Sequence, residues 1–174
     1  MELRWYQEEA VNELIKTNCA HPVVVAPTGS GKTLILCGFI DKCLTKNPKH
    51  NVLVLSHVED ILRQDFKAIE KYFGEDSCGL YSAGLSSRTI KKLTVAGIQS
   101  VYRKPEYFSQ FTIIIIDECH LINHKREGMY RKFLESFDNA QYIGLTATPW
   151  RLSHGRICDG EEALFTDIIY DLSS

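Results

Sequence analysis

Two short stretches of the chain combine residue types that handle phosphate. The first, APTGSGKT (residues 26–33), contains two glycines and ends in Lys32 and Thr33. Glycines let the backbone wrap closely around a phosphate, a lysine can reach the terminal phosphates, and a threonine hydroxyl can bind Mg²⁺. The second, DECH, places Asp117 and Glu118 directly after four isoleucines. Such a pair can hold Mg²⁺ and polarise an attacking water, which is the placement that phosphoryl transfer requires.

The segments around these stretches predict an α/β domain. Short apolar runs separated by helical patterns are typical of a mostly parallel sheet with helices on both faces. Strands are predicted within residues 21–25, 51–57, 78–84, 93–97, 111–117 and 140–149. Helices are predicted within residues 5–18, 34–44, 58–73, 98–104 and 125–137, with Gly74 ending the third, and residues 85–92 are predicted to form a turn or a short helix.

The carboxyl ends of parallel strands gather along one edge of a sheet, where ligands bind. The isoleucine strand therefore delivers Asp117 and Glu118 to that edge. We expect the strand that precedes the glycine-rich turn to be its neighbour in the sheet, so that the acidic pair faces Lys32.

Composition narrows the class of protein. A length of 174 residues suits one domain, and a net charge of −2 argues against a wholly basic nucleic-acid coat but permits a local basic groove. No apolar run reaches the roughly 20 residues that span a bilayer, and the N-terminus has no secretory pattern. The six cysteines are scattered without a C-x-x-C pair, which is typical of reduced thiols. We expect a cytoplasmic protein with no membrane partner.

Taken in order, APTGSGKT, DECH and TATP (residues 146–149) resemble the first motor domain of superfamily 2 helicases and translocases of the DEAD/DEAH-box kind. The resemblance covers essentially the whole chain. The sequences LRWYQEEAV and LSHVEDILRQ are most similar to those of the RadD-like branch of bacteria and phages, with type I and III restriction-enzyme motor subunits as relatives. It implies a three-layer RecA-like P-loop NTPase fold over residues 1–174, in a bacterial or phage-infected cell. One departure is Ala26, where the general phosphate-loop pattern has glycine.

The resemblance implies roles around a nucleotide. Residues implied in ATP binding are Arg4, Gln7, Thr28, Gly29, Ser30, Gly31, Lys32 and Thr33. Arg4 would stack on adenine and Gln7 would read its N6/N7 edge, although without the resemblance Gln7 is only a polar residue on an amphipathic helix. Lys32, Asp117 and Glu118 are implied in catalysis, and Thr33 and Asp117 in holding Mg²⁺. His120, Thr146 and Thr148 would couple the nucleotide state to a nucleic-acid groove.

A second set of residues is implied in contacts to a nucleic-acid backbone. These residues are Ser56, His57, Arg63, Gln99 and Ser100. Hydroxyls, amides and helix N-termini bind phosphate without reading sequence. For Arg63, and for Arg103 beside the second segment, a solvated helix start is an equally good interpretation.

The implied function is the ATP-binding half of a nucleic-acid-dependent ATPase that uses ATP and Mg²⁺, acting on DNA more than RNA. A helicase of this kind needs a second RecA-like domain that supplies an arginine finger, and no such motif follows TATP, so weak ATP binding and poor hydrolysis are expected of the chain alone. Residues 163–173 resemble the lead into a domain linker, and residues 150–155 a branch-specific loop. Alternatives are a restriction-type double-strand DNA translocase without unwinding, and a non-catalytic nucleotide-gated binding module.

Overall fold

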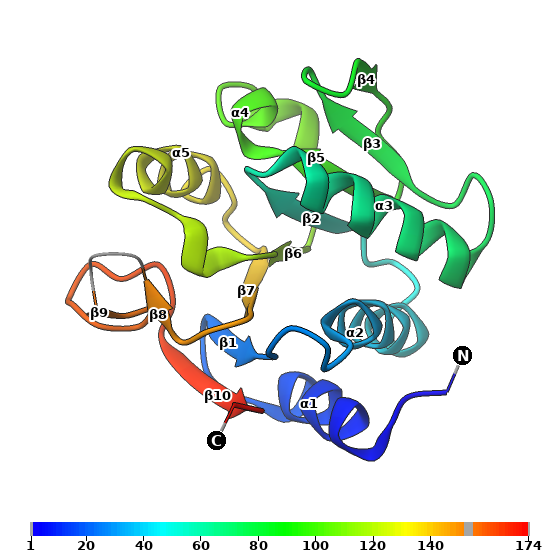
Figure 1. Cartoon of the computed structure of the whole chain (residues 1–174). Helices are drawn as coiled ribbons and strands as arrows, with labels where there is room; N and C mark the ends of the chain where they lie inside the picture. The colour runs from blue at the N-terminus through cyan, green and yellow to red at the C-terminus, as the bar shows by residue number, and fades with distance from the viewer. Residues whose placement is uncertain (1, 152–154, 174) are drawn as a thin grey trace.

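An eight-stranded sheet forms the centre of the computed structural model, which describes residues 2–151 and 155–173 (Figure 1). Its strands lie in the order β10–β1–β7–β6–β2–β5–β3–β4, and all pair in parallel except β4, which is antiparallel to β3. The strands are β1 (Pro22–Val25), β2 (Val52–Ser56), β3 (Gly79–Ser82), β4 (Ser87–Arg88), β5 (Leu93–Gly97), β6 (Ile113–Ile116), β7 (Gln141–Thr146) and β10 (Asp167–Asp171). A separate hairpin pairs β8 (Trp150–Arg151) with β9 (Gly155–Arg156).

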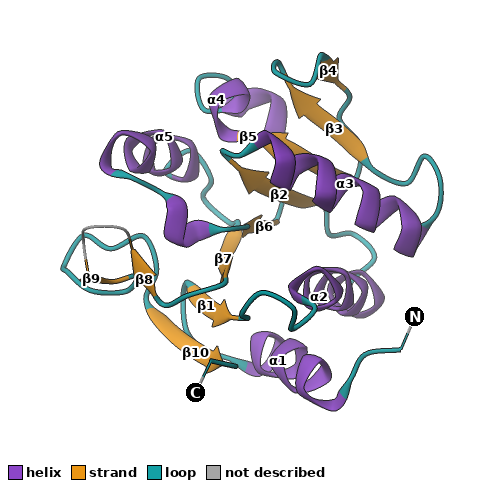
Figure 2. Ribbon diagram, viewed as in Figure 1, coloured by secondary structure: helices purple, strands orange, loops and turns teal. Residues whose placement is uncertain are grey.

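Helices cover both faces of this sheet, as Figure 2 shows. They are α1 (Trp5–Lys16), α2 (Lys32–Lys46), α3 (Glu59–Phe73), α4 (Ile98–Val101) and α5 (His124–Leu134), with 3₁₀ turns η1 (Pro105–Phe108) and η2 (Cys119–Leu121). Val52 and Val54 pack into the core with α1, α2 and α3, whereas Leu53 and Leu55 pack into the core with α4 and α5. Because alternate residues face opposite helical layers, the strands must be apolar throughout. The predicted three-layer α/β class is confirmed.

The order of the strands differs from the expectation in one respect. β7 lies between β1 and β6, with Val25 paired to Thr146 and Ile116 paired to Gly144. The strand before the glycine-rich turn and the isoleucine strand are therefore not neighbours. The prediction was wrong because strand order depends on contacts between distant segments, which no local pattern records.

Three predicted segments have other boundaries or states. Residues 85–92 contain β4, which pairs with Tyr81 and Ser82 and is neither a helix nor a simple turn. The segment interpreted as a lead into a linker contains β10, which pairs in parallel with β1 at the edge of the sheet. Helix α5 begins at His124, because the Asn123 side chain caps the nitrogen of Arg126 at 3.0 Å, and it ends at Leu134. In contrast, Gly74 ends α3 as predicted, with a φ of 113° that favours glycine.

Among the described residues, no helix combines the length and the apolar character needed to cross a membrane.

Candidate active site

The predicted site residues follow five adjacent strands and lie at the carboxyl ends of those strands (Figure 1). The loop 26–31 follows β1, the TATP segment ends β7, and Asp117 follows β6. His57 and Gln99 follow β2 and β5, the next two strands. The residues implied in nucleotide chemistry therefore lie together over β1, β7 and β6, and those implied in nucleic-acid contact lie beside them.

The loop that joins β1 to α2 owes its shape to two glycines. Gly29 and Gly31 have φ angles of 86° and 82°, which residues with a side chain rarely adopt. Gly31 is the N-cap of α2, and its carbonyl accepts bonds from the nitrogens of Leu34 and Ile35. Ala26 continues the β1–β7 ladder through a 2.7 Å bond from its nitrogen to the Thr146 carbonyl, and its φ is not positive. Alanine therefore replaces glycine there without backbone strain.

Gln7 packs into this loop from α1. Its side chain is only 2% exposed; Nε2 donates to the Ser30 carbonyl at 2.8 Å and Oε1 accepts from the Arg4 nitrogen at 2.9 Å. A Cβ added to Gly31 would overlap the Gln7 amide. Gln7 is thus part of the support of the phosphate loop, a role that sequence reasoning did not assign to it.

This packing predicts different costs for two glycine substitutions. Gly29→Ala and Gly31→Ala both place a side chain at positive φ, which costs about 1–2 kcal/mol. A Cβ at position 29 meets nothing within 4 Å, whereas one at position 31 meets Gln7. We expect Gly31→Ala to lower the free energy of unfolding by a further 1–3 kcal/mol, roughly the cost of overpacking. Denaturant unfolding of both variants measures this, and equal stabilities would contradict it.

Lys32 connects the loop after β1 to the acidic pair after β6, although β7 lies between these two strands. Its Nζ lies 2.9 Å from Oδ1 of Asp117 and forms an ion pair with Oε1 of Glu118. Burial alone would lower the pKa of Lys32, but the nearby Asp117 and Glu118 outweigh burial and raise it. The lysine is therefore held as a cation at the point where β1 and β6 present their ends.

Glu118 has a left-handed backbone, with a φ of 51°. The Asp117 carboxylate supports this conformation by accepting a 2.8 Å bond from the Glu118 nitrogen. A non-glycine residue at positive φ is uncommon, and such strained conformations cluster at functional sites. The turn directs consecutive acidic side chains toward the same lysine.

His120 links the acidic pair to the TATP segment. Its Nδ1 lies 2.7 Å from Oγ1 of Thr146 and 3.2 Å from Oε2 of Glu118. The Thr146 hydroxyl donates its single proton to the Thr148 carbonyl at 2.9 Å, so Nδ1 of His120 is the donor toward Thr146. Burial lowers the pKa of His120, and this effect outweighs the nearby Glu118, which raises it. The net lowering of the pKa favours the neutral ring. The three residues implied in coupling are thus connected in one hydrogen-bonded chain.

A third carboxyl group, which sequence reasoning missed, lies beside the acidic pair. Asp65 on α3 is 2% exposed, and its Oδ2 is buried with no hydrogen-bond partner among the described residues. Burial raises the pKa of Asp65, and Asp117, which shares a hydrogen bond with it, raises it further. A signal existed in the sequence, because Asp65 falls between Leu62 and Ile69 on the apolar face of α3.

The residues at this edge fit a magnesium ion. Among the residues that the structure describes, no three His, Cys, Asp or Glu side chains form a cage for direct metal binding. Mg²⁺ does not need such a cage, because it keeps several waters and binds through one or two carboxylates together with substrate phosphates. The carboxylate of Asp117, which lies at this edge and faces Lys32 at 2.9 Å, is a ligand of the kind that Mg²⁺ takes, and this chemistry supports the fit.

The first segment implied in nucleic-acid contact is largely engaged within the protein. Ser56 is fully buried and its Oγ accepts a 3.3 Å bond from the Val58 nitrogen, so its side chain is not presented for the backbone contact expected of it. The Nδ1 of His57 lies 3.3 Å from the Tyr130 hydroxyl. Burial and the charge of Arg126 lower the pKa of His57 to about 4, which leaves the ring neutral at pH 7.

The second segment is more open. Gln99 is exposed and its Nε2 donates to the His57 carbonyl at 2.9 Å, which joins the ends of β2 and β5. Oγ of Ser100 accepts a 2.9 Å bond from the Ala83 nitrogen. Arg63, in the second turn of α3, is exposed. The structure therefore leaves the Arg63 side chain, Oε1 of Gln99 and the hydroxyl proton of Ser100 available to a ligand.

A cavity of about 450 Å³ opens beside the phosphate loop. Trp5, which is 75% exposed, and Tyr6 line it from α1, and Tyr170 lines it from β10. Arg4 is connected to this cavity through Tyr6, whose hydroxyl accepts a 3.2 Å bond from Nη1 of Arg4. Sequence reasoning missed Tyr170, since only the pairing of β10 with β1 brings it to this place.

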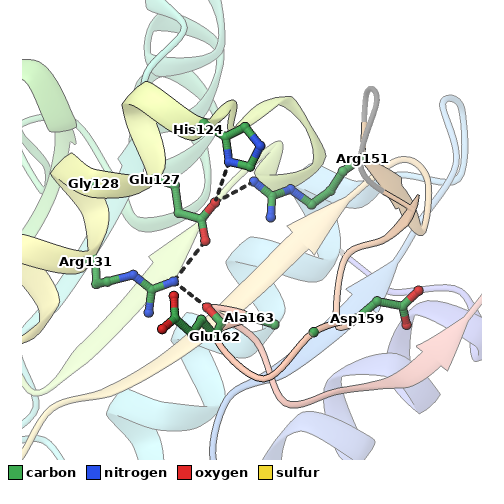
Figure 3. A pocket seen from close by; sticks show the side chains of 9 residues that line it. His124, Glu127, Gly128, Arg131, Arg151, Asp159, Glu162 and Ala163 are labelled. Atoms are coloured by element: carbon green, nitrogen blue, oxygen red, sulfur yellow. Dashed lines mark hydrogen bonds and ion pairs between the residues drawn. The ribbon is translucent and has the colours of Figure 1, made fainter.

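A second cavity, of about 540 Å³, lies between α5 and the segment after β9 (Figure 3). Glu127 stands at its centre and accepts 2.9 Å bonds from Arg131 and Arg151. Burial alone would raise the pKa of Glu127, but the two arginines lower it. Arg151 also donates to the Ile122 carbonyl at 2.9 Å, so it ties β8 to α5 in a structural role. The rest of the branch-specific loop, residues 152–154, lies outside the described residues.

Comparison with known proteins places this geometry in a family. Residues 1–151 match the family model described as type III restriction enzyme, res subunit. The chain belongs to this family. A relative is a type I restriction enzyme EcoAI endonuclease subunit of Escherichia coli, 29% identical over 164 residues, which cover 84% of this chain and 19% of the relative. The chain thus spans about a fifth of the length of that protein.

Two solved structures share the fold. The UvsW helicase of bacteriophage T4 has a TM-score of 0.72 at 22% identity, over 98% of this chain and 60% of the other. The Sulfolobus solfataricus SWI2/SNF2 ATPase core, solved in complex with dsDNA, has a TM-score of 0.68 at 18% identity, over 86% and 32%. The expected superfamily 2 motor fold is confirmed, and of the two branches named from sequence, the matched family model is that of the restriction enzymes.

Proposed function

We propose that the chain is the ATP-binding half of a DNA-dependent ATPase motor of the restriction-enzyme res-subunit family. The observation that carries the proposal is the ion pairing of Lys32 with Asp117 and Glu118. Lys32 follows β1 and the acidic pair follows β6, and β7 lies between these two strands. Such a meeting serves phosphoryl transfer, where catalysis consists mostly of placement and charge neutralisation.

The proposed roles follow the geometry of the carboxyl edge. The nitrogens of loop 28–33 and Lys32 hold the phosphates, and Glu118 orients the attacking water. Thr33 and Asp117 would hold Mg²⁺, which when bound neutralises phosphate charge. Adenine would stack in the cavity lined by Trp5, Tyr6 and Tyr170. Arg4, which bonds to Tyr6, and Gln7, which bonds to the Ser30 carbonyl, would contact the base from the start of α1. The pocket's aromatic rings support this assignment, since stacking favours flat bases.

The partner we propose is DNA, held by its backbone at the ends of β2 and β5. Arg63 and Gln99 are the exposed side chains there, and His57 contributes its backbone carbonyl to Gln99. The ATPase core that shares the fold was solved in complex with dsDNA, which supports DNA as the nucleic acid. A second RecA-like domain of the parent protein would close over the nucleotide and supply an arginine finger.

A titration tests the proposal. A fluorescent ATP analogue with Mg²⁺ is titrated against the chain, followed by an ATPase assay with and without single-stranded DNA. We expect saturable binding and negligible turnover in both assays, because the proposal assigns the arginine finger to a second domain. Absence of binding would overturn the nucleotide assignment. Robust DNA-stimulated turnover would overturn the requirement for a second domain.

A restriction-type translocase that does not separate strands is the second candidate. The E. coli relative, a type I restriction endonuclease subunit, favours it. This motor half has the same site in both cases, because strand separation depends on elements elsewhere in a helicase. A strand-displacement assay on the two-domain protein distinguishes the two: displaced strand indicates a helicase, and ATP-dependent movement along duplex DNA without it indicates a translocase.

A further inference from the structure

The DECH turn and the TATP segment follow two neighbouring strands of the sheet. DECH follows β6, and TATP lies at the end of β7, which pairs with β6. The contact between them described so far is that of His120 with Thr146, at 2.7 Å. A single link of this kind acts as a pivot, because one segment can turn about it without turning the other. A second link is needed if one segment is to set the orientation of the other.

Arg151 supplies a second link. It lies in β8, which directly follows the TATP segment, and its Nη2 donates to the Ile122 carbonyl at 2.9 Å. Ile122 is the first residue after η2, the 3₁₀ turn that contains His120. The two segments are thus joined at His120–Thr146 and again at Ile122–Arg151, and β8 packs against η2. Two points of attachment let the two segments move as one body.

Glu127 on α5 holds Arg151 in this position (Figure 3). Its Oε2 accepts a 2.9 Å bond from the same Nη2, and its Oε1 accepts one of 2.9 Å from Arg131. The side chains of Arg151 and Glu127 are only 11% and 15% exposed. A buried ion pair is weak evidence for stability, because the desolvation of both charges offsets their attraction. A role in fixing the position of β8 is therefore the better explanation of this pair.

We propose that Glu127 and Arg151 are positioning residues that carry the nucleotide state from the DECH turn to the TATP segment and β8. The proposal rests on the proposed nucleotide-binding function and deepens it. Glu118 is placed at the phosphates and lies 3.2 Å from His120, so a bound nucleotide would act first on the DECH turn. Coupling between sites travels through contiguous contacts of this kind. The TATP segment and β8 would then follow the turn only while the second link holds.

The two tryptophans of the chain allow a direct test. Trp5 lines the cavity beside the phosphate loop, and Trp150, which is 58% exposed, lies next to Arg151 in β8. The chain is labelled with fluorotryptophan and followed by fluorine NMR, and Trp150→Phe assigns the two resonances. The ligand is a non-hydrolysable ATP analogue with Mg²⁺. We expect it to shift both resonances in the wild-type chain.

Glu127→Gln is the decisive variant, because glutamine keeps the size of the side chain and removes the charge that holds Arg151. We expect the analogue to shift the Trp5 resonance as in the wild type, and the shift of the Trp150 resonance to be lost. Arg131→Ala is the matched control. It removes the other arginine partner of Glu127, which also donates to the Glu162 carbonyl, and it leaves the link through Arg151 intact. Its Trp150 shift should match the wild type.

If the analogue does not bind the wild-type chain, the proposed function fails. If it binds and the Trp150 resonance does not respond, or if Glu127→Gln keeps the response, only the role of Glu127 and Arg151 is overturned. Loss of the response in Arg131→Ala as well would also overturn it, because weakened packing would then explain both variants. Thermal unfolding checks that each variant folds. If Glu127→Gln does not, Arg151→Lys, which lacks the planar guanidinium, is measured with the same expected loss.

Discussion

Replacing Lys32 by alanine is expected to weaken binding of the Mg²⁺-bound ATP analogue about 10- to 100-fold. The magnitude is that of one lost hydrogen bond between charged groups, about 1.5–3 kcal/mol. The loop itself should remain, because the φ angles of Gly29 and Gly31 set its shape, and Lys32 begins the helix after it. Fluorescence titration measures the change, with the exposed Lys67→Ala on α3 as the control. Binding unaffected by Lys32→Ala would mean that the loop does not hold phosphate.

The same variant has a second expected effect, on stability. Lys32 pairs with both Asp117 and Glu118, and its loss leaves two largely buried carboxylates without their cation. Breaking such a pair is costly because an uncompensated charge remains, although partial exposure screens it, so we expect a loss of roughly 1–3 kcal/mol in unfolding free energy. Added Mg²⁺ should restore part of this loss in the variant. Denaturant unfolding with and without Mg²⁺ checks it, and equal stability of variant and wild type would contradict the expectation.

The parts of the site that sequence could predict are those set by local structure. The glycines of the phosphate loop, the helix that starts at Lys32, and a β-branched run that ends in Asp117 each depend on neighbours within a few residues. Burial on both sides of a central strand explains why Ile113–Ile116 is apolar throughout. These local features are sufficient to predict both the fold class and the position of the acidic pair.

The parts that sequence could not predict depend on pairing between distant segments. No local pattern predicts that β7 lies between β1 and β6. Nor does one predict that β10 places Tyr170 beside the phosphate loop. The burial of Ser56 belongs to the same class, because a strand end meets solvent or core depending on what packs over it. Asp65 is different. The sequence alone places Asp65 on the apolar face of α3. A titratable residue at such a place is a candidate for a functional site.

Replacing Glu118 by glutamine should separate nucleotide binding from hydrolysis. We expect turnover to fall about 10²–10⁴-fold, the usual contribution of a general base, in a protein that joins this chain to the proposed second domain. Binding of Mg²⁺ and ATP should change little, because glutamine keeps the size of the side chain and Asp117 still faces Lys32 at 2.9 Å. Steady-state ATPase measurements and fluorescence titration of the same preparation provide the two readouts.

The control and the contradicting result follow from where Glu118 lies. Glu135→Gln removes an exposed carboxyl beyond the end of α5, and it should leave both readouts at the wild-type level. Glu118 also faces His120 at 3.2 Å, so its substitution is expected to weaken the connection to Thr146 and with it the dependence of turnover on DNA. If Glu118→Gln left turnover unchanged, Glu118 would not be the base, and a nucleotide-gated scaffold would become the better interpretation of an otherwise complete phosphate site.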